Sequence, residues 1–180
     1  MNARGGLTQE IEAGTEAEGT SFDVVFSRHY QHVARILARV VRDPARAEEL
    51  AVDVFWKFHR HAESVDGNPA AWLYRTAVRV GLDELRRRTR RERYEKLLGF
   101  LKPSPTPEEL HAAAQEQTNV RTVLAILPPA QAQLLLLRSH GLSYNEVAAA
   151  LNLNPASVGT LLGRAQQAFR KEYVNRYGEQ

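Results

Sequence analysis

The sequence predicts an all-α protein of two small helical domains joined by a proline-rich linker, with a helix-turn-helix in the C-terminal domain. Apolar residues recur every three or four positions along most of the 180-residue chain, which is the spacing of helices that are buried on one side. Prolines at positions 103, 105 and 107 exclude a helix and favour an extended spacer. We therefore expect a disordered acidic extension over 1–20, a helical domain over 21–101, a linker over 102–117 and a second helical domain over 118–180.

Three helices are predicted in the first domain, each after a residue that can cap it. Ser21, Asp43 and Asn68 are the expected N-caps, and a proline follows the last two at the first helical position, where a missing N–H costs nothing. The first helix carries the stripe Phe22, Val25, Phe26, Tyr30, Val33, Ile36, Leu37 and Val40. The stripe of the second is Ala47, Leu50, Ala51, Val54, Phe55 and Phe58. The third helix includes Trp72 and Leu73 and continues into an arginine-rich block.

Four short helices are predicted after the linker, and the last two form the helix-turn-helix over 142–165. Ser143 and Glu146 have the spacing of a capping box. Asn152 stands where the chain must turn through a left-handed conformation, and Asn154 precedes Pro155 at the start of the second helix. This arrangement is the DNA-reading unit of many proteins. An ordinary pair of antiparallel helices would give the same pattern.

Composition excludes several classes of protein. The chain has no cysteine, so it has no disulfide, thiolate zinc site or cysteine nucleophile. It has no apolar run near the ~20 residues of a membrane span and no apolar signal peptide, so we expect a cytoplasmic protein without membrane insertion. No nucleophile–base pair or glycine-rich phosphate loop indicates an enzyme, and no cofactor is expected. The histidine pairs 29/32 and 59/61 lack the carboxylates that would make them a metal site.

Charge is unevenly distributed along the chain. Six of the eight residues over 86–93 are arginines, whereas residues 1–20 contain four glutamates and one arginine. A dense basic block favours a nucleic-acid partner, although the solvated end of a helix can also be this basic. The acidic extension could also shield the block within the chain.

Three stretches together resemble a bacterial RNA polymerase sigma factor of the extracytoplasmic-function (ECF) type. They are AEELAVDVFWKFHRH (47–61), PAAWLYRTAVRVGLDELRRRTRR (69–91) and ILPPAQAQLLLLRSHGLSYNEVAAALNLNPASV (126–158). The resemblance extends from Phe22 to Arg170. It implies a transcription initiation factor that binds core RNA polymerase, directs it to promoter DNA and has an anti-sigma factor as a partner. Two other interpretations stay open, a sigma-like adaptor and a stand-alone DNA-binding regulator.

The stripe of the second helix leaves an outward face with an apolar centre and an acidic rim, which is typical of a protein-partner surface. In the family this face docks on the polymerase clamp helices. Its expected members are Glu48, Glu49, Val52, Asp53 and Trp56. In the alternative, Trp56 packs beneath the arginine-rich helix.

The resemblance also implies two DNA-binding sites. The loop after the second helix matches the part of the family that captures a flipped base of the minus-ten element, and His61, Asp66 and Asn68 are the candidates, whereas Trp72 is expected in the core. Backbone phosphates there would be bound by Arg75, Arg79, Arg86, Arg87 and Arg90. The minus-thirty-five element would be read by Asn154, Ser157, Thr160 and Arg164. Gly159 and Leu161 stand where the family usually has cations.

Overall fold

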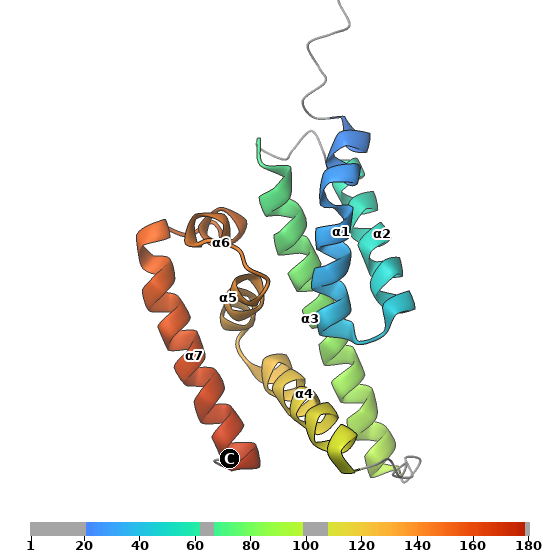
Figure 1. The fold of residues 1–180 in the computed structure, drawn as a ribbon, viewed down its shortest axis with the longest axis vertical. Coiled ribbons are helices and arrows are strands. Elements are labelled where there is room, and N and C mark those ends of the chain that lie inside the picture. The colour runs from blue at the N-terminus through green and yellow to red at the C-terminus, as the bar shows by residue number, and fades with distance from the viewer. Residues whose placement is uncertain (1–20, 62–66, 99–107, 179–180) are drawn as a thin grey trace, which may run out of the picture.

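The computed structural model describes residues 21–61, 67–98 and 108–178, and within these ranges it contains seven α-helices and no strand (Figure 1). The helices are α1 (Phe22–Val41), α2 (Pro44–His61), α3 (Pro69–Leu97), α4 (Glu108–Ile126), α5 (Pro129–Ser139), α6 (Tyr144–Leu151) and α7 (Pro155–Tyr177). The all-α prediction is therefore confirmed. The expected extension over 1–20 and the first part of the expected linker lie outside the described residues. Residues 108–117, which we placed in the linker, form the first half of α4.

The N-terminal half is a bundle of α1, α2 and α3. The predicted stripes supply its core, in which Val33, Val54, Phe55, Phe58 and Leu73 are almost completely buried. Three rings of α1 pack around Phe55, because Phe22, Phe26 and Tyr30 all lie within 6.4 Å of it, measured between ring centroids. Burying this apolar surface is the main force that holds the three helices together.

The helix caps confirm most of the predicted element boundaries. The Asp43 carboxylate accepts a hydrogen bond from the Arg46 amide at 3.1 Å, and Asn68 accepts one from the Ala71 amide at 3.0 Å. Ser143 and Glu146 form the expected capping box at the start of α6. Asn152 has the expected left-handed backbone, with φ of 54°. Ser21 was predicted to cap α1, but its hydroxyl makes no capping bond, and only its carbonyl accepts bonds from the first turn.

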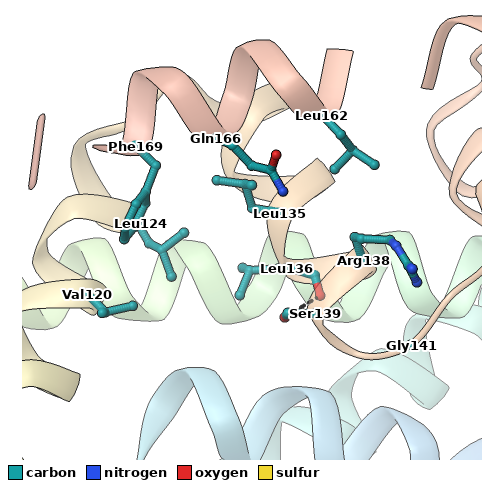
Figure 2. A pocket seen from close by; sticks show the side chains of 10 residues that line it. All are labelled: Val120, Leu124, Leu135, Leu136, Arg138, Ser139, Gly141, Leu162, Gln166 and Phe169. Carbon is teal, nitrogen blue, oxygen red and sulfur yellow. Dashed lines mark hydrogen bonds between the residues drawn. The ribbon is translucent and has the colours of Figure 1, made fainter. Parts of the chain in front are cut away.

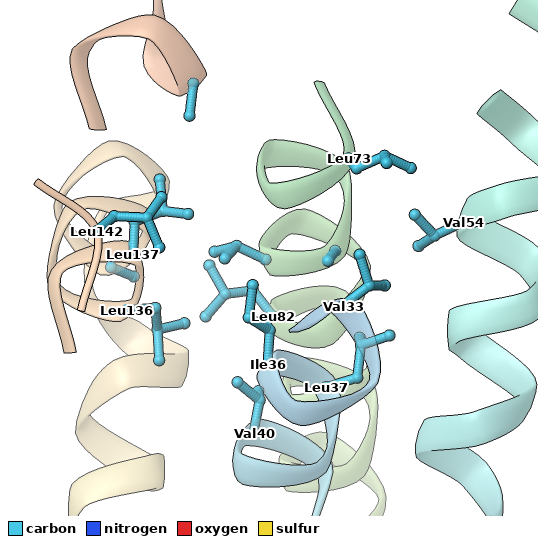
Figure 3. Packing of buried hydrophobic residues seen from close by; sticks show 14 of the residues in the cluster. Val33, Ile36, Leu37, Val40, Val54, Leu73, Leu82, Leu136, Leu137 and Leu142 are labelled. Carbon is cyan, nitrogen blue, oxygen red and sulfur yellow. The ribbon is translucent and has the colours of Figure 1, made fainter. Parts of the chain in front are cut away.

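The two halves of the chain pack on each other. Leu136 and Leu137 near the end of α5, and Leu142 in the turn after it, lie against Ile36, Val40 and Leu82 of the N-terminal bundle. All six belong to one continuous apolar cluster (Figure 3). Helices α4, α5 and α6 all contact α3. The hydrophobic core therefore extends across both halves.

Arginine side chains close the contact between the halves by bonding to carbonyls at helix C-termini, which have no partner within their own helix. Arg121 of α4 donates to the Arg39 and Val40 carbonyls at the end of α1, at 2.9 and 3.2 Å. Arg39 in turn donates to the Ser139 carbonyl at the end of α5, at 3.3 Å. Burial, together with the nearby cations Arg42 and Arg88, lowers the pKa of Arg121 to about 10. Arg121 is therefore still charged at neutral pH.

Candidate functional site

Helix α2 presents an exposed apolar patch on the side away from the core. Trp56 is 59% exposed and Val52 is 55% exposed, whereas the neighbouring Phe55 and Phe58 are each 1% exposed. The Trp56 ring stacks on His59, with centroids 5.9 Å apart. The alternative in which Trp56 packs beneath the arginine-rich helix is therefore wrong. We call the outward face formed by Glu48, Glu49, Val52, Asp53 and Trp56 the α2 surface.

The acidic rim of the α2 surface is partly paired with cations. Arg46 bridges Glu49, at 2.7 Å, and Glu84 of α3, at 3.1 Å. Glu48 and Asp53 are exposed. Because the Arg46 bridge ties α2 to α3, it holds one side of the patch in a fixed position. The result is an apolar centre on a rigid helix, flanked by carboxylates.

The two described candidates for base capture lie at the same end of the bundle. His61 at the end of α2 stacks on Trp72 of α3, with ring centroids 6.4 Å apart, and Trp72 also contacts Phe58 at 5.7 Å. Trp72 is half-buried, so it belongs partly to the core, as expected. Asn68 caps α3 through its side-chain oxygen. Asp66 lies outside the described residues.

The predicted phosphate-binding arginines of α3 do not share one environment. Arg79, Arg87 and Arg90 are exposed, and Arg75 is half-buried. Arg86 instead points into the contact between the halves, where it donates to the Ala125 carbonyl at 3.0 Å and to the Leu127 carbonyl at 3.2 Å. We predicted that Arg86 binds DNA, but in this conformation its guanidinium caps the C-terminus of α4. Sequence periodicity placed it beside the other arginines but gave no information on a partner 39 residues away.

Helix α7 has two different faces. Leu162, Gln166 and Phe169 lie on one face and line an apolar groove of about 560 Å³, together with residues of α4 and α5 (Figure 2). Thr160 and Arg164 are exposed and lie roughly opposite, because successive helical residues are rotated by about 100°. The exposed face is therefore available to a partner.

The start of α7 holds its polar residues in place. Asn154 accepts a hydrogen bond from the Ala156 amide at 2.9 Å, and the Ser157 hydroxyl donates to the Asn154 carbonyl at 2.7 Å. A Cβ added to Gly163 would meet nothing within 4 Å, and one added to Gly159 would meet only the Tyr144 ring, at 3.4 Å. Packing among the described residues therefore does not explain why residue 163 is glycine.

One exposed aromatic residue within the helix-turn-helix was not among the predicted site residues. Tyr144, the first residue of α6, is 47% exposed, and the Arg138 guanidinium lies over its ring at 5.7 Å from the centroid. An exposed aromatic next to a helix cap is the sequence signal that could have indicated it. This pair places a cation and a ring beside the exposed start of α7.

Within the described ranges, no three histidine, cysteine or acidic side chains gather in a way that could hold a metal ion. None of the helices in those ranges is both long and apolar enough to cross a membrane.

Family models match both halves of the chain. Sigma-70 region 2 matches residues 25–91, and sigma-70 region 4 matches residues 117–168. The chain belongs to the sigma-70 family. The first match contains the α2 surface and the α3 arginines as far as Arg91, and the second contains α5, α6 and the exposed face of α7.

Curated relatives place this sigma factor in the ECF group. It is 26% identical over 175 residues to the ECF RNA polymerase sigma factor SigE of Mycolicibacterium smegmatis, with 93% of this chain and 66% of SigE covered. It is 27% identical over 183 residues to the RNA polymerase sigma-H factor of Pseudomonas aeruginosa, with 92% of this chain and 95% of that protein covered. The sigma factor thus spans about two thirds of SigE and nearly all of sigma-H.

Two solved structures share the fold of this sigma factor. CnrH, in complex with the cytosolic domain of CnrY, is 21% identical, with a TM-score of 0.52 and coverage of 83% of this chain and 85% of CnrH. The sigma factor RpoE of Bartonella quintana, in complex with the anti-sigma factor NepR, is 18% identical, with a TM-score of 0.50 and coverage of 86% and 96%. At these identities the likeness concerns the fold alone.

Proposed function

We propose that this sigma factor binds core RNA polymerase through the α2 surface and directs it to promoters through two DNA-binding sites, one in each half. The exposure of Trp56 together with Val52 carries the proposal, because an apolar patch with a polar rim is typical of a surface that binds a protein partner. The protein would act in the cytoplasm and catalyse no reaction itself.

The size of the α2 contact can be worked from its exposure. A fully exposed tryptophan has about 250 Å² of surface, and 59% of the Trp56 surface is open. Burying about 150 Å² at ~25 cal/mol per Å² corresponds to about 3.7 kcal/mol, or roughly five-hundredfold in affinity. Trp56 would thus be the anchor of the contact, and the acidic rim would fix its orientation against basic residues of the partner.

In the N-terminal half, the exposed end of the bundle would hold the opened minus-ten element. The stacked rings of His61 and Trp72 offer a surface of the kind on which an extruded base can stack. Arg75, Arg79, Arg87 and Arg90 would neutralise phosphates of the same strand. Asp66 and Asn68 complete the proposed site.

In the C-terminal half, α7 would lie in the major groove of the minus-thirty-five element. Its exposed Asn154 and Thr160 and the half-buried Ser157 would face base edges, and Arg164 would contact phosphate. Gly159 and Gly163 lie beside this face and have no side chain, which would let the DNA backbone approach that side of the helix closely. The same glycines reduce its charge, so the site would depend less on salt than a lysine-rich one.

The test is reconstitution with core polymerase. The sigma factor and core enzyme should together give a defined transcript from the DNA upstream of its own gene. Trp56→Ala should weaken binding to core by roughly five-hundredfold and leave binding to free duplex DNA unchanged. Lys57 is the exposed, charged residue next to Trp56 on the same helix, and Lys57→Ala is the matched control. An equal loss of core and DNA binding in the Trp56 variant would contradict the proposal.

The uncharged recognition face favours one alternative function, a sigma-like adaptor that binds polymerase but reads DNA weakly. Stable core binding without a transcript would establish that alternative. An anti-sigma factor is a further proposed partner, since CnrH and RpoE were both solved with such a protein or its cytosolic domain.

A further inference from the structure

Two histidines lie in the contact between the halves, and each has one ring nitrogen without a partner. His32 belongs to α1, and His140 follows directly after α5. Nε2 of His32 and Nε2 of His140 are both buried and make no hydrogen bond among the described residues. A buried polar atom without a partner has a free-energy cost, so each of these atoms calls for a physical explanation.

His32 packs against an aromatic ring. Its ring lies 4.5 Å from that of Tyr74 on α3, and the Tyr74 hydroxyl is 3.0 Å from Nδ1 of His29. Burial is the main cause that lowers the pKa of His32, and Arg35 on the same helix adds to it. Glu146 of α6 acts in the opposite direction, but its carboxylate is already bonded to the Ser143 amide and hydroxyl at 2.7 Å each.

His140 is fixed in one tautomer by its own helix. Its Nδ1 lies 2.7 Å from the Leu136 carbonyl, and because a carbonyl can only accept, Nδ1 carries the proton. In the neutral ring, Nε2 is then a bare acceptor in an apolar contact. Burial lowers the pKa of His140, and the cation of Arg39 and the ring of His32 contribute. The Leu136 and Ile36 carbonyls have the opposite effect.

The fourth helix adds two further charged groups beside His140. Glu116 and Arg121 of α4 line a cavity of about 420 Å³ that His140 also reaches. Arg121 bonds to the end of α1 in the same contact. Around the two imidazoles there are thus the cations Arg35, Arg39 and Arg121 and the carboxylates Glu116 and Glu146. The closed contact therefore favours neutral rings.

We propose that mild acid opens the contact between the two halves of this sigma factor, with His32 and His140 as the groups that sense the proton. In the closed form a proton on Nε2 of His32 would find no acceptor, and one on either ring would place a further positive charge in a contact where cations already outnumber carboxylates. In the open form both rings reach water and accept the proton freely. Opening also releases Arg86 from the end of α4, so that it can join the exposed arginines of α3.

Proton linkage gives the direction in which pH shifts the opening equilibrium. Above the ordinary histidine pKa of about 6.5 both rings are neutral in either form, and pH has no effect. As the pH falls below that value, the open form takes up protons and the closed form does not. The opening constant then rises by up to about tenfold per pH unit for each histidine, and the rise ends once the closed form is also protonated. Two histidines give up to about a hundredfold per unit.

The proposal can be tested on the free chain, without polymerase or DNA, so its outcome is independent of the proposed function. The chain has no cysteine, so a dye pair can be attached at Arg60→Cys on α2 and Gln167→Cys on α7, both exposed positions. Energy transfer between the dyes should fall between pH 7.5 and 5.5, while the helical circular dichroism is unchanged.

Substitutions of the two histidines test whether they cause the fall in energy transfer at low pH. His32→Phe keeps a ring that can pack against Tyr74, and His140→Asn keeps a donor for the Leu136 carbonyl. Together they should abolish the pH dependence of energy transfer. His59→Asn, which removes an exposed histidine of α2, should leave it intact. Energy transfer that is constant from pH 7.5 to 5.5 in the unsubstituted chain, or that still changes in the double variant, would overturn the proposal.

A second measurement does not depend on the variants being folded. Histidine resonances of the labelled, unsubstituted chain report the pKa of each ring. His32 and His140 should both titrate below 6.5, in step with the loss of energy transfer. If either ring titrates at or above 6.5, the closed contact does not exclude its proton and the proposal is wrong.

Discussion

Removal of the Arg86 side chain should open the contact between the halves at neutral pH. Arg86 donates two hydrogen bonds to the Ala125 and Leu127 carbonyls at the C-terminus of α4, and among the described residues its one ion pair is a 3.9 Å contact with the exposed Asp83. A hydrogen bond from a charged donor contributes ~1.5–3 kcal/mol when it is buried. The Arg86 side chain is 26% exposed, so water can reach the freed carbonyls, and we take the lower value for each bond.

The two bonds together give about 3 kcal/mol, which corresponds to a change of roughly 150-fold in the opening constant. Arg87→Ala is the matched control. It removes the same charge from the next position of α3, but Arg87 is exposed and makes no bond to the described residues of the other half, so the expected effect is within ±0.5 kcal/mol.

The dye pair at positions 60 and 167 provides the assay. At pH 7.5, Arg86→Ala should lower energy transfer toward its acid value, and Arg87→Ala should match the unsubstituted chain. When Arg121→Ala is added to Arg86→Ala, energy transfer should fall by less than the sum of the two single effects. The bonds of both arginines hold the same contact, so their energies are coupled. If the Arg86 and Arg87 variants give the same energy transfer, the arginine bonds do not hold the halves together.

Three further predictions concern the helix-turn-helix. Gly163→Ala should raise the free energy of unfolding by about 1 kcal/mol in urea denaturation, because the new Cβ meets nothing within 4 Å and glycine is a poor helix former; a loss of stability would mean that the position is strained. Ser143→Ala should lower the same free energy by about 1 kcal/mol, since it removes half of the capping box, and Ser139→Ala at the other end of the turn serves as a control. Arg164→Ala should weaken duplex binding and lower the slope of log affinity against log salt by about one unit in a titration by fluorescence anisotropy, whereas an unchanged slope would mean that Arg164 does not contact phosphate.

Local interactions explain why so much of the fold could be predicted. A capping box or an asparagine in a left-handed turn involves residues only a few positions apart, so Ser143, Glu146 and Asn152 were recognisable from the sequence. The apolar stripes were also correct, because a period of 3.6 residues determines which side of a helix is buried. The one wrong cap, Ser21, was predicted from residue type alone, and its hydroxyl makes no bond to the first turn.

The sequence by itself determined the helices, the helix-turn-helix and the family, since each depends on residues close together in the chain. Only the tertiary structure decided that Trp56 is exposed, that Arg86 caps α4 and that His32 and His140 meet in one contact. The residues that interact with Arg86, His32 and His140 lie tens of positions away in the sequence, and these two histidines are 108 positions apart. They come within reach only when the two halves pack. Periodicity gives the direction of a side chain around its own helix, but burial and pairing depend on what another helix brings to that side.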